Sequence, residues 1–115
     1  MPIAIEDLPR DVTKLVLSGR IDIAGAQEID MPINVVAGSR RAVVIDLSGV
    51  DFMASMGLRL LVVCAKSIFS KRGKVVLLSP QPPVEEVIRV SGIDTLIPIH
   101  SDEAAAIAAV APAPG

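Results

Sequence analysis

The segment "VVIDLSGVDFMASMGLRLLVV", residues 43–63, does most to decide the fold, because it joins two different apolar patterns. Residues 42–47 are nearly all apolar and rich in valine, which is typical of a central strand buried on both faces. From Ser55 the apolar positions recur with the period of a helix, and Gly73 is expected to end it. The residues expected on its buried face are Leu58, Leu61, Val62, Ala65, Ile68 and Phe69. A buried strand followed by an amphipathic helix predicts an α/β fold.

The same patterns predict the remaining elements on either side of this segment. Strands are expected at residues 3–9, 12–19, 74–79 and 95–99, and helices at 21–38, 80–92 and 101–111. Pro32 should kink the first of these helices or delay its start, Gly38 should end it, and Ser101 should cap the last. Pro98 favours an edge position for the strand at 95–99. The order predicts a single-domain α/β fold: a mixed, mostly parallel β-sheet of four to five strands, mixed at one edge, with about four helices.

Length and charge narrow the class of protein. The 115 residues suit one domain, which we assign to residues 1–110, with a disordered C-terminal tail at 111–115. The absence of a long apolar run and of a signal peptide predicts a cytoplasmic location and no direct membrane insertion. A net charge of −2 argues against a nucleic-acid binder, and the basic stretches at 39–42 and 66–74 are interpreted as solvated helix ends and turns. The single cysteine, Cys64, is interpreted as a small buried apolar residue.

The sequence offers few residues for catalysis. His100 is the only histidine, so a multi-histidine metal site is impossible, and no glycine-rich phosphate loop occurs. A Ser55–His100–Asp arrangement stays open, although Ser55 lies outside a Gly-x-Ser-x-Gly elbow. Asp46 ends a buried strand, as a receiver-type phospho-acceptor would, but the strand at 95–99 supplies no lysine, and we interpret Asp46 and Asp51 as turn residues. We therefore predict a protein that is not an enzyme and has no catalytic residues, cofactor or metal.

Three motifs in order resemble one family. The segment at 43–63 is similar to the central signature of STAS domains, a family that includes bacterial anti-sigma-factor antagonists and cytoplasmic domains of transporters. "LVLSGRIDIAGAQEI", residues 15–29, resembles its first signature, in which a strand ends near a glycine and an aspartate and leads into a helix. Residues 73–107 resemble its closing strand–helix–strand–helix pattern. The resemblance extends over residues 12–110.

The resemblance implies a function through binding. In the antagonists, a serine in an Asp-Ser-Ser/Thr/Ala-Gly motif is phosphorylated by the anti-sigma factor, which is a protein kinase. By position that serine is Ser55 and the glycine is Gly57, while Ala54 replaces the aspartate and Met56 the small residue. Ser55 also suits the N-cap of the following helix, where a phosphate would meet free N–H groups.

The partner-binding surface is expected at Asp22, Met56, Gly57 and Arg59, with ATP supplied by the kinase partner. A partly exposed Met56 would suit an adaptable docking surface. Because of Ala54 and Met56, a phosphorylation-independent STAS adaptor of a transporter or sensory complex is the alternative. A third hypothesis is an enzyme with Ser55 as its nucleophile.

Overall fold

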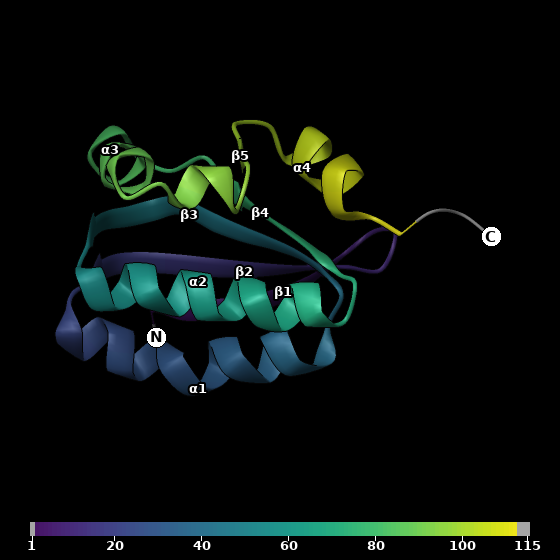
Figure 1. Ribbon diagram of the computed structural model, residues 1–115, viewed down its shortest axis with the longest axis horizontal. Coiled ribbons are helices and arrows are strands. Elements are labelled where there is room, and N and C mark those ends of the chain that lie inside the picture. The colour runs from purple at the N-terminus through teal and green to yellow at the C-terminus, as the bar shows by residue number, and fades with distance from the viewer. Residues whose placement is uncertain (1, 113–115) are drawn as a thin grey trace.

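The computed structural model describes residues 2–112 and is shown in Figure 1. Within that range the chain forms five strands, four α-helices and one 3₁₀ helix. The elements are β1 (Ile3–Leu8), β2 (Val12–Ile21), α1 (Ile23–Ser39), β3 (Ala42–Met53), α2 (Ser55–Ser70), β4 (Lys74–Leu78), α3 (Pro82–Val90), η1 (Ile93–Thr95), β5 (Ile99–His100) and α4 (Glu103–Val110). Of the tail expected at 111–115, the last three residues lie outside the described range. No helix in the described part of the chain is both long and apolar enough to cross a bilayer.

The strands form one sheet in the order β1-β2-β3-β4-β5. β1 is antiparallel to β2, and every other neighbouring pair is parallel. The predicted fold class, a mixed and mostly parallel sheet with about four helices, is confirmed. The antiparallel pair is the β1–β2 hairpin, and the parallel pairs require the helical crossovers that the alternation of strands and helices predicted.

Alternate residues of the central strands feed two apolar clusters on opposite faces. In β3, Val43, Ile45 and Leu47 join the larger cluster, while Val44 joins the smaller. The larger cluster also holds the buried sides of α1 and α2, which lie side by side below the sheet in Figure 1. The smaller cluster packs against Ala106 and Val110 of α4, on the other side of the sheet. The central strands are therefore buried on both faces, as their continuous apolar runs predicted.

The predicted end of the central strand at residue 47 was wrong, and so was the turn predicted around Asp46 and Asp51. β3 continues from residue 47 to Met53, so Asp46 and Asp51 lie in a strand and not in a turn. The reason is that β2 also extends, to Ile21, and offers β3 a partner along this length. α1, expected at 21–38, starts two residues later than expected, at Ile23, and ends at Ser39. It continues through Pro32, with Ile29 and Ile33 buried on either side of the proline.

The C-terminal part and α2 hold the other corrections. Residues 93–95 form η1 and not a strand, because Gly92 (φ +80°) reverses the chain and lets Ile93 turn into the core; only Ile99 and His100 pair with β4. Asp102 caps α4 in place of Ser101, since its carboxylate accepts from Ala105 N–H at 2.9 Å. Phe69 is exposed and does not belong to the buried face of α2.

Candidate partner-docking site at the starts of α1 and α2

Two helix starts lie side by side at the carboxyl ends of the central strands. β2 ends at Ile21 and leads into α1, and β3 ends at Met53 and leads into α2. The two ends are joined by a hydrogen bond of 2.8 Å in which Ala54 N–H donates to the carbonyl of Ile21. Ligands of open α/β sheets bind outside the carboxyl ends of the strands, which makes this junction the candidate site.

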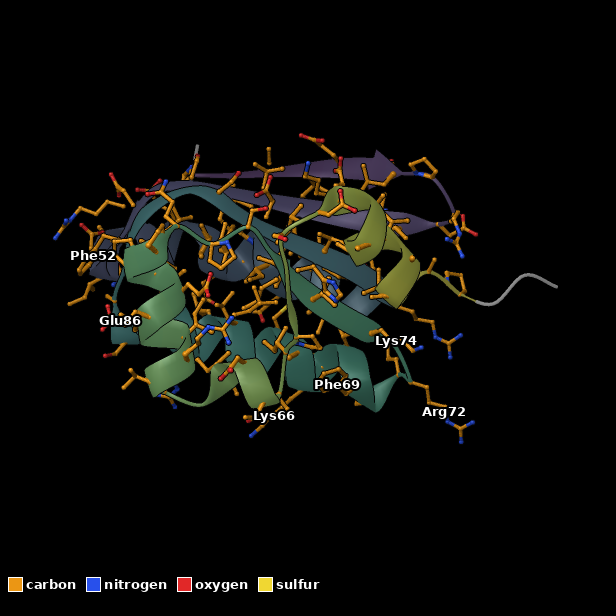
Figure 2. All side chains as sticks on the ribbon, turned by 90° about the horizontal axis from the view of Figure 1, so that it is seen from above. Phe52, Lys66, Phe69, Arg72, Lys74 and Glu86 are labelled. Carbon is orange, nitrogen blue, oxygen red and sulfur yellow. The ribbon has the colours of Figure 1, made fainter. Side chains whose placement is uncertain are left out.

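We call this region the helix-start surface. Its members are exposed or half-buried side chains from β2, α1, β3 and α2: Arg20, Asp22, Ile23, Phe52, Ser55, Met56 and Arg59. Figure 2 shows Phe52 at this end of the molecule, with Arg72 and Lys74 at the other.

Ser55 is the first residue of α2, and its side chain is exposed. The prediction that it caps the helix is wrong, because the N-cap position belongs to Ala54, whose backbone is extended (φ −79°, ψ 165°) and whose side chain cannot accept a hydrogen bond. Ala54 takes this position because its own N–H is held by Ile21, so the chain turns one residue earlier than the serine. Among residues 2–112, no partner engages the Ser55 hydroxyl, which leaves it accessible for modification.

The amide groups at this helix start are not satisfied by a cap. The first N–H groups of a helix have no hydrogen-bond acceptor within the helix. At α2, no side chain of the described residues caps the helix by accepting a hydrogen bond from them. The first amide of α2 that has an acceptor is that of Leu58, whose N–H donates a hydrogen bond of 3.1 Å to the carbonyl of Ala54. Together with the helix dipole, these free N–H groups favour a negative charge at Ser55.

Gly57 supports the surface from inside. It is buried, and a Cβ at this position would overlap the sulfur of Met53 and lie 2.9 Å from Cγ2 of Ile21. Gly57, which was predicted to contact the partner, therefore faces the core. Because it has no side chain, α2 can pack closely on the ends of β2 and β3. Met53 is buried, whereas Met56 is 44% exposed and presents its side chain at the surface.

Asp22 links two parts of the surface. One of its carboxylate oxygens accepts a hydrogen bond of 2.8 Å from Gly25 N–H and caps α1. The other lies 3.6 Å from Nε of Arg20, in an exposed ion pair that contributes little stability by itself. The Arg20 guanidinium also stacks on the ring of Phe52, 4.0 Å from its centroid. Asp22 is thus held in a fixed position between a helix start and a cation.

Sequence reasoning missed Arg20 and Phe52. They lie opposite each other because β3 carries two extra residues relative to β2, one between the pairs of Val16 and Ser18 and one just before Phe52. Such bulges redirect side chains and are frequent near functional sites. The available signal was Phe52 itself, one of only two aromatic residues, next to a strand end.

Apolar and cationic side chains complete the surface. Ile23 is 61% exposed and Phe52 38% exposed, and together with Ala54 they line a shallow hollow between the start of α1 and the end of β3. Arg59 is exposed and follows Ser55 by four residues, so the two side chains share one face of α2. An apolar patch beside a hydroxyl and two arginines is suited to binding a protein surface.

The Ser55–His100–Asp arrangement is not formed. His100 pairs with Leu78 of β4, which pairs with Asp46 of β3. Met53, the last residue of β3, lies seven residues beyond Asp46, and Ser55 follows two residues later. At a rise of about 3.3 Å per residue this separation is roughly 20 Å, so the imidazole of His100 cannot reach the hydroxyl.

Other reactive groups are occupied or buried. Asp46 lies 3.6 Å from Nζ of Lys14, which also donates a hydrogen bond of 2.9 Å to Glu103, and this bond together with the neighbouring carboxylates raises the pKa of Lys14. No group of three His, Cys, Asp or Glu side chains within residues 2–112 could hold a metal ion. Burial raises the pKa of the Cys64 thiol to about 11, which keeps it protonated and unreactive at neutral pH.

Known proteins resemble this chain over most of its length. The model of the family described as "STAS domain" matches residues 5–106. BtrV of Bordetella bronchiseptica, which carries the name of an anti-sigma factor antagonist, is 35% identical over 95 residues that cover 81% of each chain. The anti-sigma F factor antagonist of Paenibacillus polymyxa is 28% identical over 100 residues, covering 85% of this chain and 86% of that protein.

The fold has the same relatives. The crystal structure of an anti-sigma factor antagonist from Mycobacterium paratuberculosis superposes with a TM-score of 0.84 and 31% identity, covering 94% of this chain and 92% of that one. The family match covers the sheet, its crossover helices and both helix starts, in agreement with the three sequence motifs. The chain belongs to the STAS domain family.

Proposed function

We propose that this protein is an anti-sigma-factor antagonist that docks through the helix-start surface on a kinase-type anti-sigma factor in the cytoplasm, and that phosphorylation of Ser55 controls the complex. The family and the names of its relatives support the antagonist function. The observation that carries the regulatory part is the position of Ser55: exposed, at the first turn of α2, with its hydroxyl free of any capping role.

The geometry supports a switch that acts on the complex and leaves the fold intact. A phosphate adds a charge of about −1.5 to −2 at pH 7. At a helix start this charge is favourable by about 0.3–1 kcal/mol, and Arg59 lies one turn further along the same face. Met56 and Ile23, however, must lose water when a partner docks, and a dianion beside them resists that desolvation. Phosphorylation therefore weakens docking.

The alternative is an adaptor that binds its partner without phosphorylation. Two observations favour it: Ala54 places no carboxylate beside the hydroxyl, and the half-exposed Met56 adds a bulky apolar group next to it. In this alternative the helix-start surface docks on a transporter or sensory assembly, and Ser55 is only one residue of the contact.

The test is phosphate transfer. The protein is incubated with ATP and an anti-sigma-factor kinase of its source organism, and the product is mapped by mass spectrometry. We expect one phosphate on Ser55, none on Ser55→Ala, and weaker binding of the phosphorylated form. A phosphate on Ser48 or Ser101 would contradict the assignment of the acceptor. A stable complex with no phosphate transfer would support the adaptor.

A further inference from the structure

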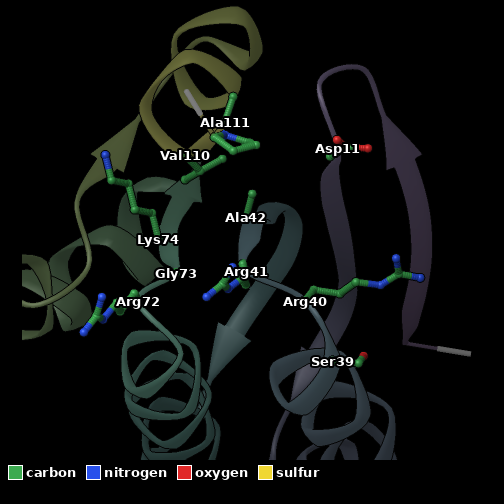
Figure 3. A pocket seen from close by; sticks show the side chains of 11 residues that line it. Asp11, Ser39, Arg40, Arg41, Ala42, Arg72, Gly73, Lys74, Val110 and Ala111 are labelled. Carbon is green, nitrogen blue, oxygen red and sulfur yellow. The ribbon is translucent and has the colours of Figure 1, made fainter. Parts of the chain in front are cut away.

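A second candidate site lies at the opposite end of the sheet from Ser55. A cavity of about 590 Å³ opens there between the ends of α1, α2 and α4 and the first residues of β3 and β4. Figure 3 shows Arg41 in the middle of this cavity, with Arg40 on one side and Arg72 and Lys74 on the other. We call it the basic pocket. None of its residues belongs to the helix-start surface.

The basic pocket is positively charged, whereas the chain as a whole is negatively charged. It gathers four of the eleven lysines and arginines of a protein whose net charge is −2, and Asp11 is the one acid that lines it. No ion pair within residues 2–112 involves Arg40, Arg41, Arg72 or Lys74. The mutual repulsion of these cations is therefore not relieved by a salt bridge, and an anion in the cavity would relieve it.

The backbone holds these cations in unusual ways. Arg72, which follows the end of α2, has a φ of +62°. This is the left-handed region, which glycine adopts more easily than any other residue. Arg41 is fixed by a hydrogen bond of 3.0 Å from its Nε to the carbonyl of Lys71, which leaves the outer nitrogens of its guanidinium for a ligand. Gly73 lies so close to the carbonyl of Arg41 that a Cβ would overlap it. Strained non-glycine residues are concentrated at binding sites.

The remaining walls define the class of ligand. Val110, Ala111 and Pro112 supply apolar groups to the lining, and Figure 3 shows Ala42 between Val110 and Arg41. The volume is within the range of about 300–1,000 Å³ that is typical of small-molecule sites. We propose that the basic pocket binds a small organic oxyanion, a phosphate ester or carboxylate attached to an apolar body. The oxyanion faces Arg41 and Lys74, and the apolar body lies against the half-buried Ala111 and the exposed Pro112.

The test uses probes that separate charge from apolar area. The full chain is titrated with 1-naphthyl phosphate and with 1-naphthoate, followed by amide chemical shifts. Inorganic phosphate and 1-naphthol serve as controls that carry only one of the two features. We expect saturable binding of at least one organic anion, with a Kd of about 1 mM or tighter. Shifts should be confined to residues 40–42, 72–74 and 110–112, and the tighter of the two anions identifies the preferred oxyanion.

The variant Arg72→Gln/Lys74→Gln removes two exposed cations whose side chains make no hydrogen bond within the described residues, so its fold should be preserved. We expect it to bind the organic anion about tenfold or more weakly, and the matched control Lys66→Gln, which changes an exposed lysine of α2 outside the pocket, to bind it like the wild type. Equal affinity in the double variant, equal binding of 1-naphthol or inorganic phosphate, or shifts at 54–57 would overturn the proposal.

Discussion

The starts of α1 and α2 follow neighbouring parallel strands, lie in contact, and are built differently. α1 begins after Asp22, whose carboxylate satisfies Gly25 N–H. α2 begins after Ala54, which offers no acceptor and leaves its first-turn amide groups free. Both use a buried glycine to approach the strand ends, Gly25 in α1 and Gly57 in α2. One start is completed by the chain itself, and the other leaves a place where a negative charge can be added.

The largest expected effect is the loss of stability when the buried glycines Gly25 and Gly57 are replaced by alanine, and it should differ between them. In Gly25→Ala the new Cβ would lie 2.5 Å from the carbonyl oxygen of Arg20, a backbone atom that cannot move without disturbing β2. In Gly57→Ala it meets the flexible end of Met53 and a methyl of Ile21. We expect urea denaturation to show a loss of about 2–3 kcal/mol for Gly25→Ala and about 1–2 kcal/mol for Gly57→Ala.

The matched control for this pair is Gly38→Ala. Its Cβ would meet nothing within 4 Å, and the residue lies in the last turn of α1. This variant should be unchanged or more stable by up to about 1 kcal/mol, since alanine is the better helix former. If Gly25→Ala were no more harmful than Gly38→Ala, the close packing at the start of α1 would be refuted.

The second prediction removes the existing cap. Asp22→Ala leaves Gly25 N–H without its acceptor and Arg20 without its carboxylate partner. We expect a decrease in unfolding free energy of about 1 kcal/mol, measured by urea denaturation. Asp22→Asn is the matched variant, because it keeps an acceptor but removes the charge, and should recover most of the loss. Equal losses in the two would assign the effect to the ion pair.

The third prediction adds the missing cap. Ala54→Asp places a carboxylate at the N-cap of α2, where the backbone already has the extended conformation that a cap requires. The variant should be more stable by about 1 kcal/mol, and its melting temperature should rise by a few degrees. It also restores the acid of the antagonist motif, so phosphate transfer to Ser55 should become faster. A lower melting temperature would show that the free helix start is already satisfied in another way.

The smallest effect is expected at Ser55. Because the hydroxyl is exposed and does not cap α2, Ser55→Ala should change the unfolding free energy by less than about 0.5 kcal/mol. Ser55→Asp should be stable to a similar degree or slightly more so, through the dipole of α2, while its binding to the partner is weaker. The measurements are thermal melts with circular dichroism and binding by calorimetry. A strongly destabilised Ser55→Ala variant would contradict this prediction and show that the serine has a structural role.

The sequence predicted the fold well because its central strands and helices carry strong apolar patterns. Residues 42–47 and the helix from Ser55 are found where they were expected. The continuation of β3 through "SGVDFM", residues 48–53, could not be predicted, because these residues look like a turn and become a strand only by pairing with β2. The capping error at Ser55 has the same origin, since a bond from a distant strand fixes where α2 begins.

The two candidate sites differ in how far the sequence predicted them. Ser55, Asp22, Met56 and Arg59 were identified through the family resemblance, and their contact with a partner remains a prediction. The basic stretches at 39–42 and 66–74 were interpreted separately as solvated ends. They meet because β3 and β4 pair in register, with Ala42 opposite Lys74. No local pattern contains that information.

The position of Ala54 has a consequence for how such a protein can change over generations. Since the N-cap of α2 is Ala54 and the helix does not use the Ser55 hydroxyl, we expect that a single substitution can remove this serine, the proposed acceptor, or bring it back while the chain stays folded. Neither step requires a compensating change elsewhere. Under the proposed function, responsiveness to a kinase is then a trait that a lineage can lose and regain on a constant scaffold, whereas losing the aspartate at the start of α1 removes a helix cap and costs about 1 kcal/mol of stability.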